Sequence, residues 1–219
     1  HYFRHDVITV GDSAHVRLDG CVIANSGRNG VTITNSFQSG IANSTLQDLG
    51  WGGLTLAGGN RTTLQPSNLY ALGNRITATG RVLRTHHPAI HMHGVGVHVR
   101  NNMVWNIGHS ALELSGNNHV IDGNEFRDIA WECGDCGAVV ASHSLSYLGN
   151  TISNNVFRNI RSLFTEKGTV RAIFLQDHAS GFTIIGNHFI NASDAVLIGG
   201  GRQNRVLMNT FQGFTIIGN

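Results

Sequence analysis

A five-residue pattern that recurs along the chain constrains the fold more than any other feature. A small residue is followed by two apolar residues that alternate with variable ones, as in residues 30–34, GVTIT. Seven copies begin at small residues, namely Gly30, Gly53, Ala89, Ala111, Ala138, Ala172 and Ala195. Alternation with a period of two is typical of a β-strand, and the Gly or Asn that follows most copies indicates a turn.

A second motif lies between the copies, an asparagine followed by a variable and an apolar residue. It occurs at Asn102, Asn124, Asn155, Asn187 and Asn209. Val104 and Phe126 in neighbouring motifs are 22 residues apart, as are Phe189 and Phe211. A period of this length, lengthened elsewhere by loop insertions, predicts an all-β solenoid, a right-handed parallel β-helix of about eight coils. We expect the asparagines to stack at turns and to act structurally.

The repeat continues almost to both ends of the chain. Residues 213–219 repeat residues 181–187, and the chain begins with a histidine rather than a methionine. Solenoids need end caps. We therefore expect a single β-helix domain over residues 1–219 that is part of a longer protein.

In this register the residues between the inward apolar positions point outward and form two rows across the coils. The first row contains Thr32, Thr55, His91, Glu113, Val140, Phe174 and Leu197, and the second contains Thr34, Ala57, His93, Ser115, Ser142, Gln176 and Gly199. Longer loops after Ala57, Ser142 and Phe157 would wall this face. The pattern is compatible with a plain solvated scaffold, with a groove for an extended polymer, or with a metal site at His91, His93 and Glu113.

The low charge of the chain bears on its partners. Charged residues make up 13% of the sequence, and the net charge is +2. Nucleic acid or an anionic membrane surface is therefore not the expected partner, because phosphate binding needs clustered Lys and Arg. No apolar run of transmembrane length occurs either. Three glycosylation sequons, at Asn43, Asn60 and Asn191, would matter in a eukaryotic secreted chain.

Cys133 and Cys136 form a lone C-x-x-C motif. No second C-x-x-C and no finger-spaced pair of histidines accompanies it, so a zinc site is disfavoured, and no βαβ pattern supports redox catalysis. A short disulfide that braces the loop around Asp135 suits an extracellular protein. Cys21 would then stay unpaired and buried in a coil.

Asp177 ends the sixth copy of the repeat, where most copies end in Gly, Asn or His, and His178 follows it. His143 holds the corresponding position one coil earlier. An acid beside a histidine suggests acid–base chemistry, whereas an aspartate that stabilises a turn explains the same residues structurally.

Several stretches between residue 88 and about residue 211 resemble a known group of proteins. They are PAIHMHGVGVHVRNNMVWNIGHSALELSGNNHVIDGNEF, DCGAVV, AIFLQDHASGFTIIGNHF and VLIGGGRQNRV. The resemblance is to secreted, pectin-lyase-like right-handed parallel β-helix proteins, including β-helix glycoside hydrolases of the α-fucosidase- and xylanase-like group. In that group the loop before "GA" usually carries two acids, and a later strand ends in two more.

The resemblance implies catalytic roles for Asp135 and Asp177, which keep one acid of each pair. Gly134 and Gln176 stand where the other two acids are expected. The Arg-Asp-Trp that usually follows the "GA" strand is replaced by residues 143–145, HSL.

Simple stacking puts Asp135 and Asp177 about eight residues apart along the strand direction, roughly 26 Å. The two carboxyl groups of a glycosidase lie only about 5–10 Å apart. Either the loops fold back over the groove, or Glu113 and the histidines are the partners of Asp177.

The favoured hypothesis is therefore an extracellular polysaccharide-binding β-helix that acts as a glycoside hydrolase without a cofactor. One carboxyl would protonate the leaving oxygen and the other would act as base or nucleophile. The predicted catalytic residues are Asp135 and Asp177, with Glu132, His109 and His178 beside them, and the predicted substrate-binding residues are His91, His93, Glu113 and His143. One alternative is a non-catalytic structural or adhesive β-helix within a larger extracellular assembly. The other is a polysaccharide lyase or epimerase, which the absence of Lys and Arg from both rows disfavours.

Overall fold

The computed structural model describes residues 5–164 and 170–213, and these residues form three parallel sheets without any helix. The first sheet contains β1 (Ile8–Gly11), β4 (Val31–Thr34), β7 (Leu54–Gly58), β10 (Ile90–Val95), β13 (Leu112–Asn117), β16 (Gly137–Ala141), β19 (Arg171–Leu175) and β22 (Asp194–Ile198). The second contains β2 (Arg17–Asp19), β5 (Gly40–Ala42), β8 (Tyr70–Leu72), β11 (His98–Arg100), β14 (Val120–Asp122), β17 (Asn150–Ser153), β20 (Phe182–Ile185) and β23 (Arg205–Leu207). The third contains β3 (Val22–Ala24), β6 (Thr45–Gln47), β9 (Arg75–Thr77), β12 (Met103–Ile107), β15 (Glu125–Ile129), β18 (Val156–Ile160), β21 (His188–Ala192) and β24 (Thr210–Gln212).

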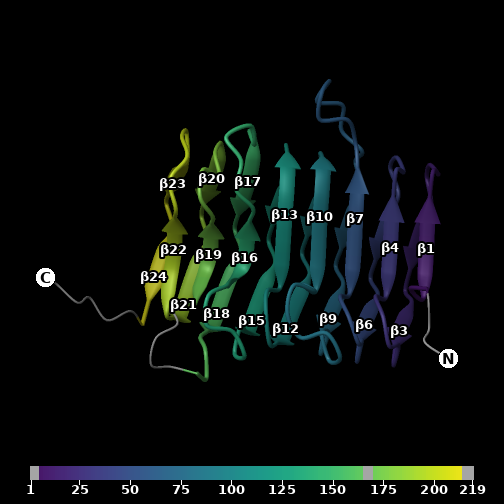
Figure 1. Ribbon diagram of the computed structural model, residues 1–219, viewed down its shortest axis with the longest axis horizontal. Coiled ribbons are helices and arrows are strands. Elements are labelled where there is room, and N and C mark those ends of the chain that lie inside the picture. The colour runs from purple at the N-terminus through teal and green to yellow at the C-terminus, as the bar shows by residue number, and fades with distance from the viewer. Residues whose placement is uncertain (1–4, 165–169, 214–219) are drawn as a thin grey trace, which may run out of the picture.

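Each coil of the chain contributes one strand to each sheet in turn, and every strand pairs in parallel with its counterparts in the neighbouring coils. Figure 1 shows the coils side by side along the long axis of the molecule, from the N-terminal coil at β1 to the C-terminal coil at β22. The fold is the predicted right-handed parallel β-helix. Its eight strands per sheet agree with the expected number of coils.

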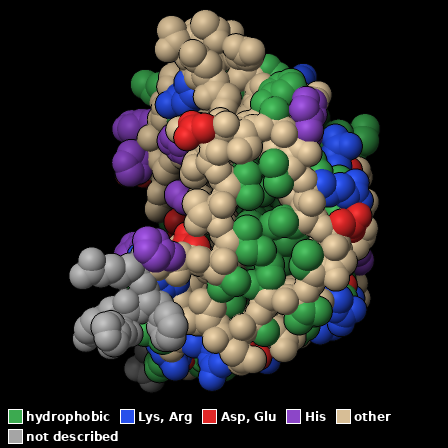
Figure 2. All heavy atoms as spheres, turned by 90° about the vertical axis from the view of Figure 1, so that its right-hand side faces the viewer, with side chains coloured by type: hydrophobic (Ala, Val, Ile, Leu, Met, Phe, Trp, Pro, Cys, Tyr) green, Lys and Arg blue, Asp and Glu red, His purple; other side chains and the backbone are tan. Residues whose placement is uncertain are grey.

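The apolar residues of the repeat form the interior, as their alternation predicts. Val31 and Ile33 on β4 are fully buried, whereas Thr32 and Thr34 between them are only half-buried. The buried core runs from Ile23 to Ala192. At the N-terminal end, hydrophobic side chains lie in the middle of the end face and polar ones surround them (Figure 2). Ile8, Val10 and Leu18 of the first coil pack against this core.

The asparagine motif forms a buried ladder at the turn between the second and third sheets, confirming the structural interpretation. Asn124 Oδ1 accepts hydrogen bonds from the backbone and side-chain nitrogens of Asn102, both at 2.9 Å. Its own Nδ2 donates to Val99 O and to Asn155 Oδ1, also at 2.9 Å. The ladder satisfies backbone groups that would otherwise be buried without partners.

The apolar residue of the same motif builds a column of stacked rings. Phe126, Phe157 and Phe189 stack with centroid separations of 5.1 Å, and Phe211 follows at 5.2 Å. This spacing is close to the distance between neighbouring strands of a sheet, so identical residues on successive coils meet face to face.

Cys133 and Cys136 form a disulfide, one of the interpretations that the C-x-x-C motif left open, and both are buried. Cys21 is free, as expected, but it is half-buried rather than buried. It lies at the turn before β3, where its backbone N–H donates to Ser44 Oγ. The three sequon asparagines, Asn43, Asn60 and Asn191, are exposed. Across residues 5–164 and 170–213 there is no helix of the length and hydropathy needed to cross a bilayer.

Candidate functional site

The two predicted outer rows exist on the first sheet. Pairing across the coils joins His91 to Thr55 and to Glu113, and Glu113 in turn to Val140. In the second row, His93 lies between Ala57 and Ser115, and its Nδ1 is 2.6 Å from Ser115 Oγ. The period-two register therefore assigned the outward positions correctly.

Two cavities share His109 as a lining residue, and the larger one extends along the first sheet, from His109 and Asp135 before β13 and β16 to Ser142 and Gln176 after β16 and β19. The larger one has a volume of about 290 Å³. It is lined by His86, His91, His109, Ser110, Glu113, Leu114, Ser115, Asp135, Cys136, Val140, Ser142 and Gln176. We call this the carboxylate cavity, because Glu113 and Asp135 both line it. Two carboxylates in one cavity, beside imidazole and hydroxyl groups, can carry acid–base chemistry.

Glu113 reaches the carboxylate cavity from the middle of β13. Desolvation by burial raises the pKa of its carboxyl, while a hydrogen bond with Ser110 and the charge of His86 act in the opposite direction. Burial disfavours the charged form of a carboxyl group, so Glu113 holds its proton to a higher pH than an exposed glutamate does.

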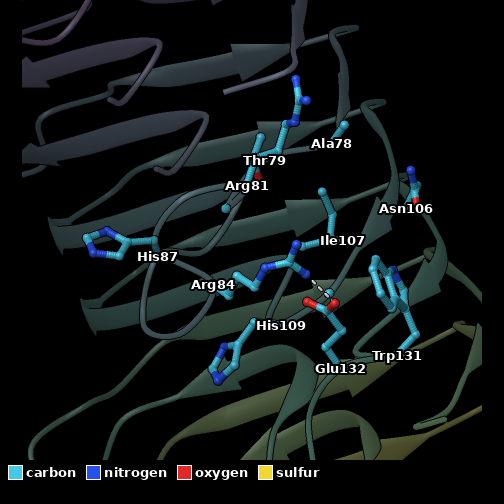
Figure 3. Close-up of a pocket in the computed structure, with 12 residues that line it drawn as sticks. Ala78, Thr79, Arg81, Arg84, His87, Asn106, Ile107, His109, Trp131 and Glu132 are labelled. Atoms are coloured by element: carbon cyan, nitrogen blue, oxygen red, sulfur yellow. Dashed lines mark hydrogen bonds and ion pairs between the residues drawn. The ribbon is translucent and has the colours of Figure 1, made fainter. Parts of the chain in front are cut away.

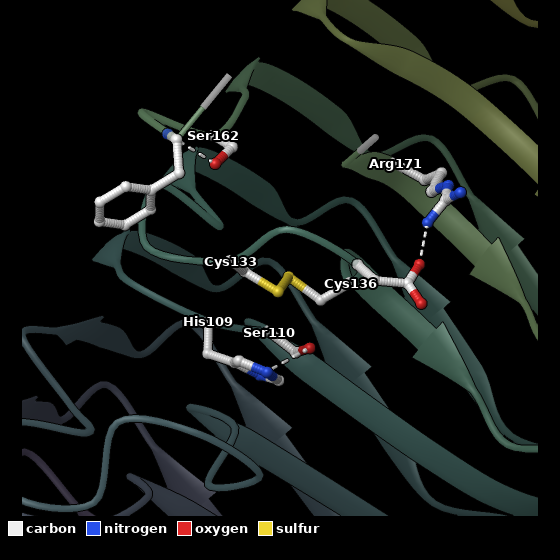
Figure 4. The surroundings of a disulfide bond; sticks show 8 residues. His109, Ser110, Cys133, Cys136, Ser162 and Arg171 are labelled. Atoms are coloured by element: carbon white, nitrogen blue, oxygen red, sulfur yellow. Dashed lines mark hydrogen bonds and ion pairs between the residues drawn. A yellow bond between two sulfur atoms is a disulfide. The ribbon is translucent and has the colours of Figure 1, made fainter. Parts of the chain in front are cut away.

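Asp135 enters the same cavity from the loop that joins β15 to β16. Its carboxylate is exposed and forms an ion pair with Arg171 at the start of β19, whose side chain is only 13% exposed (Figure 4). Asp135 lies between Cys133 and Cys136 in the sequence, and these two cysteines are joined by the disulfide. Arg171 and the disulfide therefore hold the loop that presents this carboxylate.

The smaller cavity, of about 180 Å³, lies on the other side of His109. Glu132 lines it and forms an ion pair with Arg84, which comes from the loop after β9 (Figure 3). His87 and Trp131 complete the cavity wall around this pair. Glu132 thus lies close to the carboxylate cavity without lining it.

The remaining predicted site residues lie outside both linings. Asp177 and His178 are exposed where β19 ends, directly after Gln176, which does line the carboxylate cavity. His143 is exposed in the loop after β16, and His93 is exposed on β10. The lining of the carboxylate cavity thus brings together Asp135, Glu113, His91 and His109, and it does not include Asp177.

Two residues of the carboxylate cavity, His86 and Ser110, were not singled out from the sequence, and neither was Arg171, which forms an ion pair with Asp135. His86 belongs to the loop between β9 and β10, which carries Arg84 as well. The sequence does indicate a long loop here, because Gly53 and Ala89 start successive repeat copies that are 36 residues apart instead of 22. Nothing in the local sequence marks Ser110 or Arg171, which acquire their roles through contacts between coils.

The comparison with protein families agrees with this architecture. The profile described as "Periplasmic copper-binding protein (NosD)" matches residues 2–191, most of the chain. The chain belongs to the NosD family. No curated protein sequence matches it.

Solved structures similar to this NosD-family chain share its fold at low sequence identity. A glycoside hydrolase superposes with a TM-score of 0.72 and 12% identity over 92% of this chain and 37% of its own. The A-module of an Azotobacter vinelandii mannuronan C-5 epimerase gives 0.60 and 16%, over 89% and 57%. A surface adhesin of Streptococcus pneumoniae gives 0.51 and 12%, over 93% and 60%. The chain spans less than two thirds of each of these structures.

Proposed function

We propose that this chain is a periplasmic or extracellular glycan-binding β-helix and that its carboxylate cavity hydrolyses a glycosidic bond. The observation that carries the proposal is the shared lining of Glu113 and Asp135 in one open cavity on the outward face of the first sheet. Glycoside hydrolases need two carboxyl groups on either side of the scissile bond. The fold shared with a glycoside hydrolase and an epimerase that acts on mannuronan supports a carbohydrate ligand.

In this proposal Glu113 is the general acid. Its raised pKa favours the protonated form of the carboxyl, and that proton passes to the leaving glycosidic oxygen. Asp135 is the base or nucleophile, with Arg171 orienting its carboxylate. His109 and Glu132 lie close enough to tune this pair, and His91 contacts the sugar along the outer row, with His93 and His143 extending the glycan path beyond the cavity.

Asp177, with His178 beside it, remains the second catalytic acid in the arrangement that the resemblance implies. In that arrangement the glycan would run along the first sheet from Asp135 to the far end of β19, and the cleavage site would lie nearer to Gln176, which lines the cavity next to Asp177 in sequence.

The test compares three variants on fucose- and xylose-containing glycans by the release of reducing sugar. Glu113→Gln and Asp135→Asn should each lower kcat roughly 10²–10⁴-fold, and Asp177→Asn should leave it nearly unchanged. Loss of activity in Asp177→Asn with an active Glu113→Gln would transfer the acid role to Asp177. Full activity in all three variants would remove the catalytic assignment altogether.

A non-catalytic, adhesive β-helix is the second candidate, favoured by the exposed position of Asp177 and by the unbroken row of threonines at positions 9, 32 and 55. It predicts glycan binding without hydrolysis. Calorimetric binding to an array of glycans, with no sugar released from those that bind, would identify it.

A polysaccharide lyase or epimerase is the third candidate. Arg171 supplies a cation beside the carboxylate cavity, which such an enzyme needs for a uronate carboxylate, although here the guanidinium is paired with Asp135. Absorbance from an unsaturated product after incubation with polyuronates would distinguish a lyase from a hydrolase.

The family description names copper, and Cu(I) favours thiolate and imidazole ligands. Such donors come together at His109, Cys133 and Cys136, whose ligand atoms all lie within 4.8 Å of one another. In the disulfide form the two sulfur atoms are bonded to each other, so this group suits copper only after reduction. The proposed glycan chemistry therefore does not involve the metal.

A further inference from the structure

We propose that the smaller cavity is a subsite for a uronate unit of the bound glycan, which it holds through the carboxylate of that unit. The inference rests on the proposed glycan ligand and adds its chemical class. The smaller cavity shares His109 with the carboxylate cavity, and Glu132 on its lining belongs to the same loop as Asp135. A sugar unit next to the one in the carboxylate cavity can therefore reach it.

The size of the smaller cavity suits a single sugar unit. Its volume of about 180 Å³ is below the roughly 300–1,000 Å³ of pockets that enclose drug-sized ligands. Figure 3 shows the loop that carries His87 and Arg84 on one side and Trp131 on the opposite side. The side chain of Arg84 is 58% exposed and that of its partner Glu132 is 26% exposed. This ion pair therefore lies at the mouth of the cavity, where a ligand enters.

Two polar atoms of the lining have no hydrogen-bond partner among the described residues. They are Thr79 Oγ1 and Trp131 Nε1, and both atoms are buried. Thr79 as a whole is only 6% exposed. A buried polar group without a hydrogen bond costs free energy, which a ligand that supplies the bond recovers. An indole N–H can only donate, so the ligand has to present an acceptor oxygen to Trp131.

The charged groups of the lining favour a carboxylate as that acceptor. Arg81 and Arg84 supply two cations, against Glu132 as the acid of the lining. The ion pair of Arg84 with Glu132 uses Nη1, and so does that of Arg81 with Asp48, which lies outside the lining. A guanidinium has five N–H donors, so each arginine keeps donors for a second acceptor. Arginine binds carboxylates through two parallel hydrogen bonds, which the ligand carboxylate can accept here.

The two histidines of the lining suit the hydroxyl groups of a sugar ring. Desolvation by burial lowers the pKa of both His87 and His109, and the charge of His86 acts in the same direction. A neutral imidazole offers one donor and one acceptor, which matches a sugar hydroxyl. The positive charge of the cavity at neutral pH therefore comes from the arginines, and it is directed at the carboxylate.

An NMR experiment on the indole N–H groups monitors this cavity and does not depend on hydrolysis. The chain has three tryptophans, so ¹⁵N-labelled protein should show one indole cross-peak for each, and Trp131→Phe assigns the peak of Trp131 by its loss. Titration with D-glucuronate should move this peak to saturation and leave that of Trp105 on β12 in place. D-Glucose and D-glucuronamide, which lack the charged carboxylate, should bind roughly tenfold more weakly or less.

Variants of the lining test the individual groups. Arg84→Gln should weaken glucuronate binding roughly tenfold or more and leave glucose binding nearly unchanged, because it removes a charged donor for the carboxylate. Thr79→Val keeps the shape of the side chain and should weaken the binding of glucuronate several-fold. Arg17→Gln is the matched control, since Arg17 on β2 is also an exposed arginine paired with an acid. Circular dichroism checks that each variant is folded.

The outcomes separate the uronate subsite from the proposed hydrolysis. Glucuronate that binds no more tightly than glucose, a Trp131 peak that does not move, or unchanged affinity in Arg84→Gln would each overturn the subsite, even if the protein hydrolyses neutral glycans. A shift of the Trp131 peak that Arg84→Gln abolishes, in a protein that releases no sugar from any glycan, would confirm the subsite and remove the hydrolase assignment.

Discussion

Glu113 illustrates how the environment of one residue decides its chemistry. It occupies an outward position of a surface strand, where the repeat places threonine in other coils. The loops around the carboxylate cavity desolvate it, and its pKa rises. Such a group is useful to catalysis and unfavourable for stability, because the ionised form is poorly solvated at neutral pH.

Glu113→Gln should therefore stabilise the protein at neutral and alkaline pH. A carboxyl with a raised folded-state pKa binds more protons in the folded state, so the stability of the wild type falls as pH rises through that pKa. Glutamine does not titrate. Urea unfolding at about pH 8 should give a higher free energy of unfolding for the variant, with a smaller difference at about pH 4. If the wild type and Glu113→Gln had equal free energies of unfolding at both pH values, burial of Glu113 would have no energetic effect.

His119 is a second residue whose environment has a measurable consequence. It is fully buried at the turn between the first and second sheets. Its Nδ1 accepts the Val97 N–H at 3.2 Å, and its Nε2 donates to Ser115 O at 3.2 Å, so the ring is neutral. Burial lowers the pKa of His119 to about 4.

The wild type should consequently lose up to about 3 kcal/mol of stability as pH falls from about 6.5 to about 4, because the unfolded chain binds a proton that the buried ring excludes. His119→Asn should flatten this dependence. Asn150 and Asn204 accept the corresponding N–H groups in other coils, so asparagine keeps the hydrogen bond to Val97 without titrating. Unfolding curves at about pH 7.5 and about pH 4.5 measure the difference.

At the scale of elements, strands of three to six residues are stable here because identical positions repeat in register. No single strand buries enough surface by itself, and the ladders at the turns join the coils. The asparagine ladder is the clearest case. Each side chain satisfies a backbone N–H and a backbone carbonyl of the coil before its own, as Asn124 does for Asn102 and Val99.

Asn124→Ala should lower the free energy of unfolding by about 2–4 kcal/mol, because the N–H of Asn102 and the carbonyl of Val99 would be buried without partners. Glu125→Ala is the matched control, since this neighbouring side chain points outward from β15 and is half-buried. Chemical denaturation of both variants makes the comparison. A similar loss of stability in Glu125→Ala would show that the effect comes from the strand rather than from the asparagine ladder.

At the scale of the whole molecule, the solenoid predicts that a complete coil can be removed. His98 and Val120 occupy equivalent positions in neighbouring coils, so deletion of residues 98–119 joins Val97 to Val120 in register. The loss of Glu113 and His109 abolishes the carboxylate cavity. The asparagine ladder should continue across the deletion, with Asn124 next to Asn74. The protein should stay folded with a lower Tm, as circular dichroism and thermal melting can show.

Deletion of residues 98–108 alone is the control for register. It removes about half a coil, so the chain that follows cannot return to the first sheet at the correct position. This variant should aggregate or remain unfolded. Equal folding of both deletions would contradict the dependence of the fold on the 22-residue period.

Several features of the structure could be predicted from the sequence. Both outer rows, the buried positions of Val31 and Ile33 and the asparagine ladder followed from alternation and spacing. The C-x-x-C motif was compatible with the disulfide but did not require it, and the structure shows it. Asp177 illustrates the limit of prediction from a sequence motif. Its motif resembles a catalytic strand end, but its side chain is not part of the cavity lining.

The sequence by itself determined the sheets, the register and the core. Period-two alternation and a 22-residue repeat are local patterns, and each coil contains them within its own residues. Only the tertiary structure decided which polar groups meet. Glu113 and Asp135 line one cavity, and His109 approaches Cys133 and Cys136, across coils and through loops of irregular length. The conformation of such loops depends on contacts between residues far apart in the chain, which no repeat encodes.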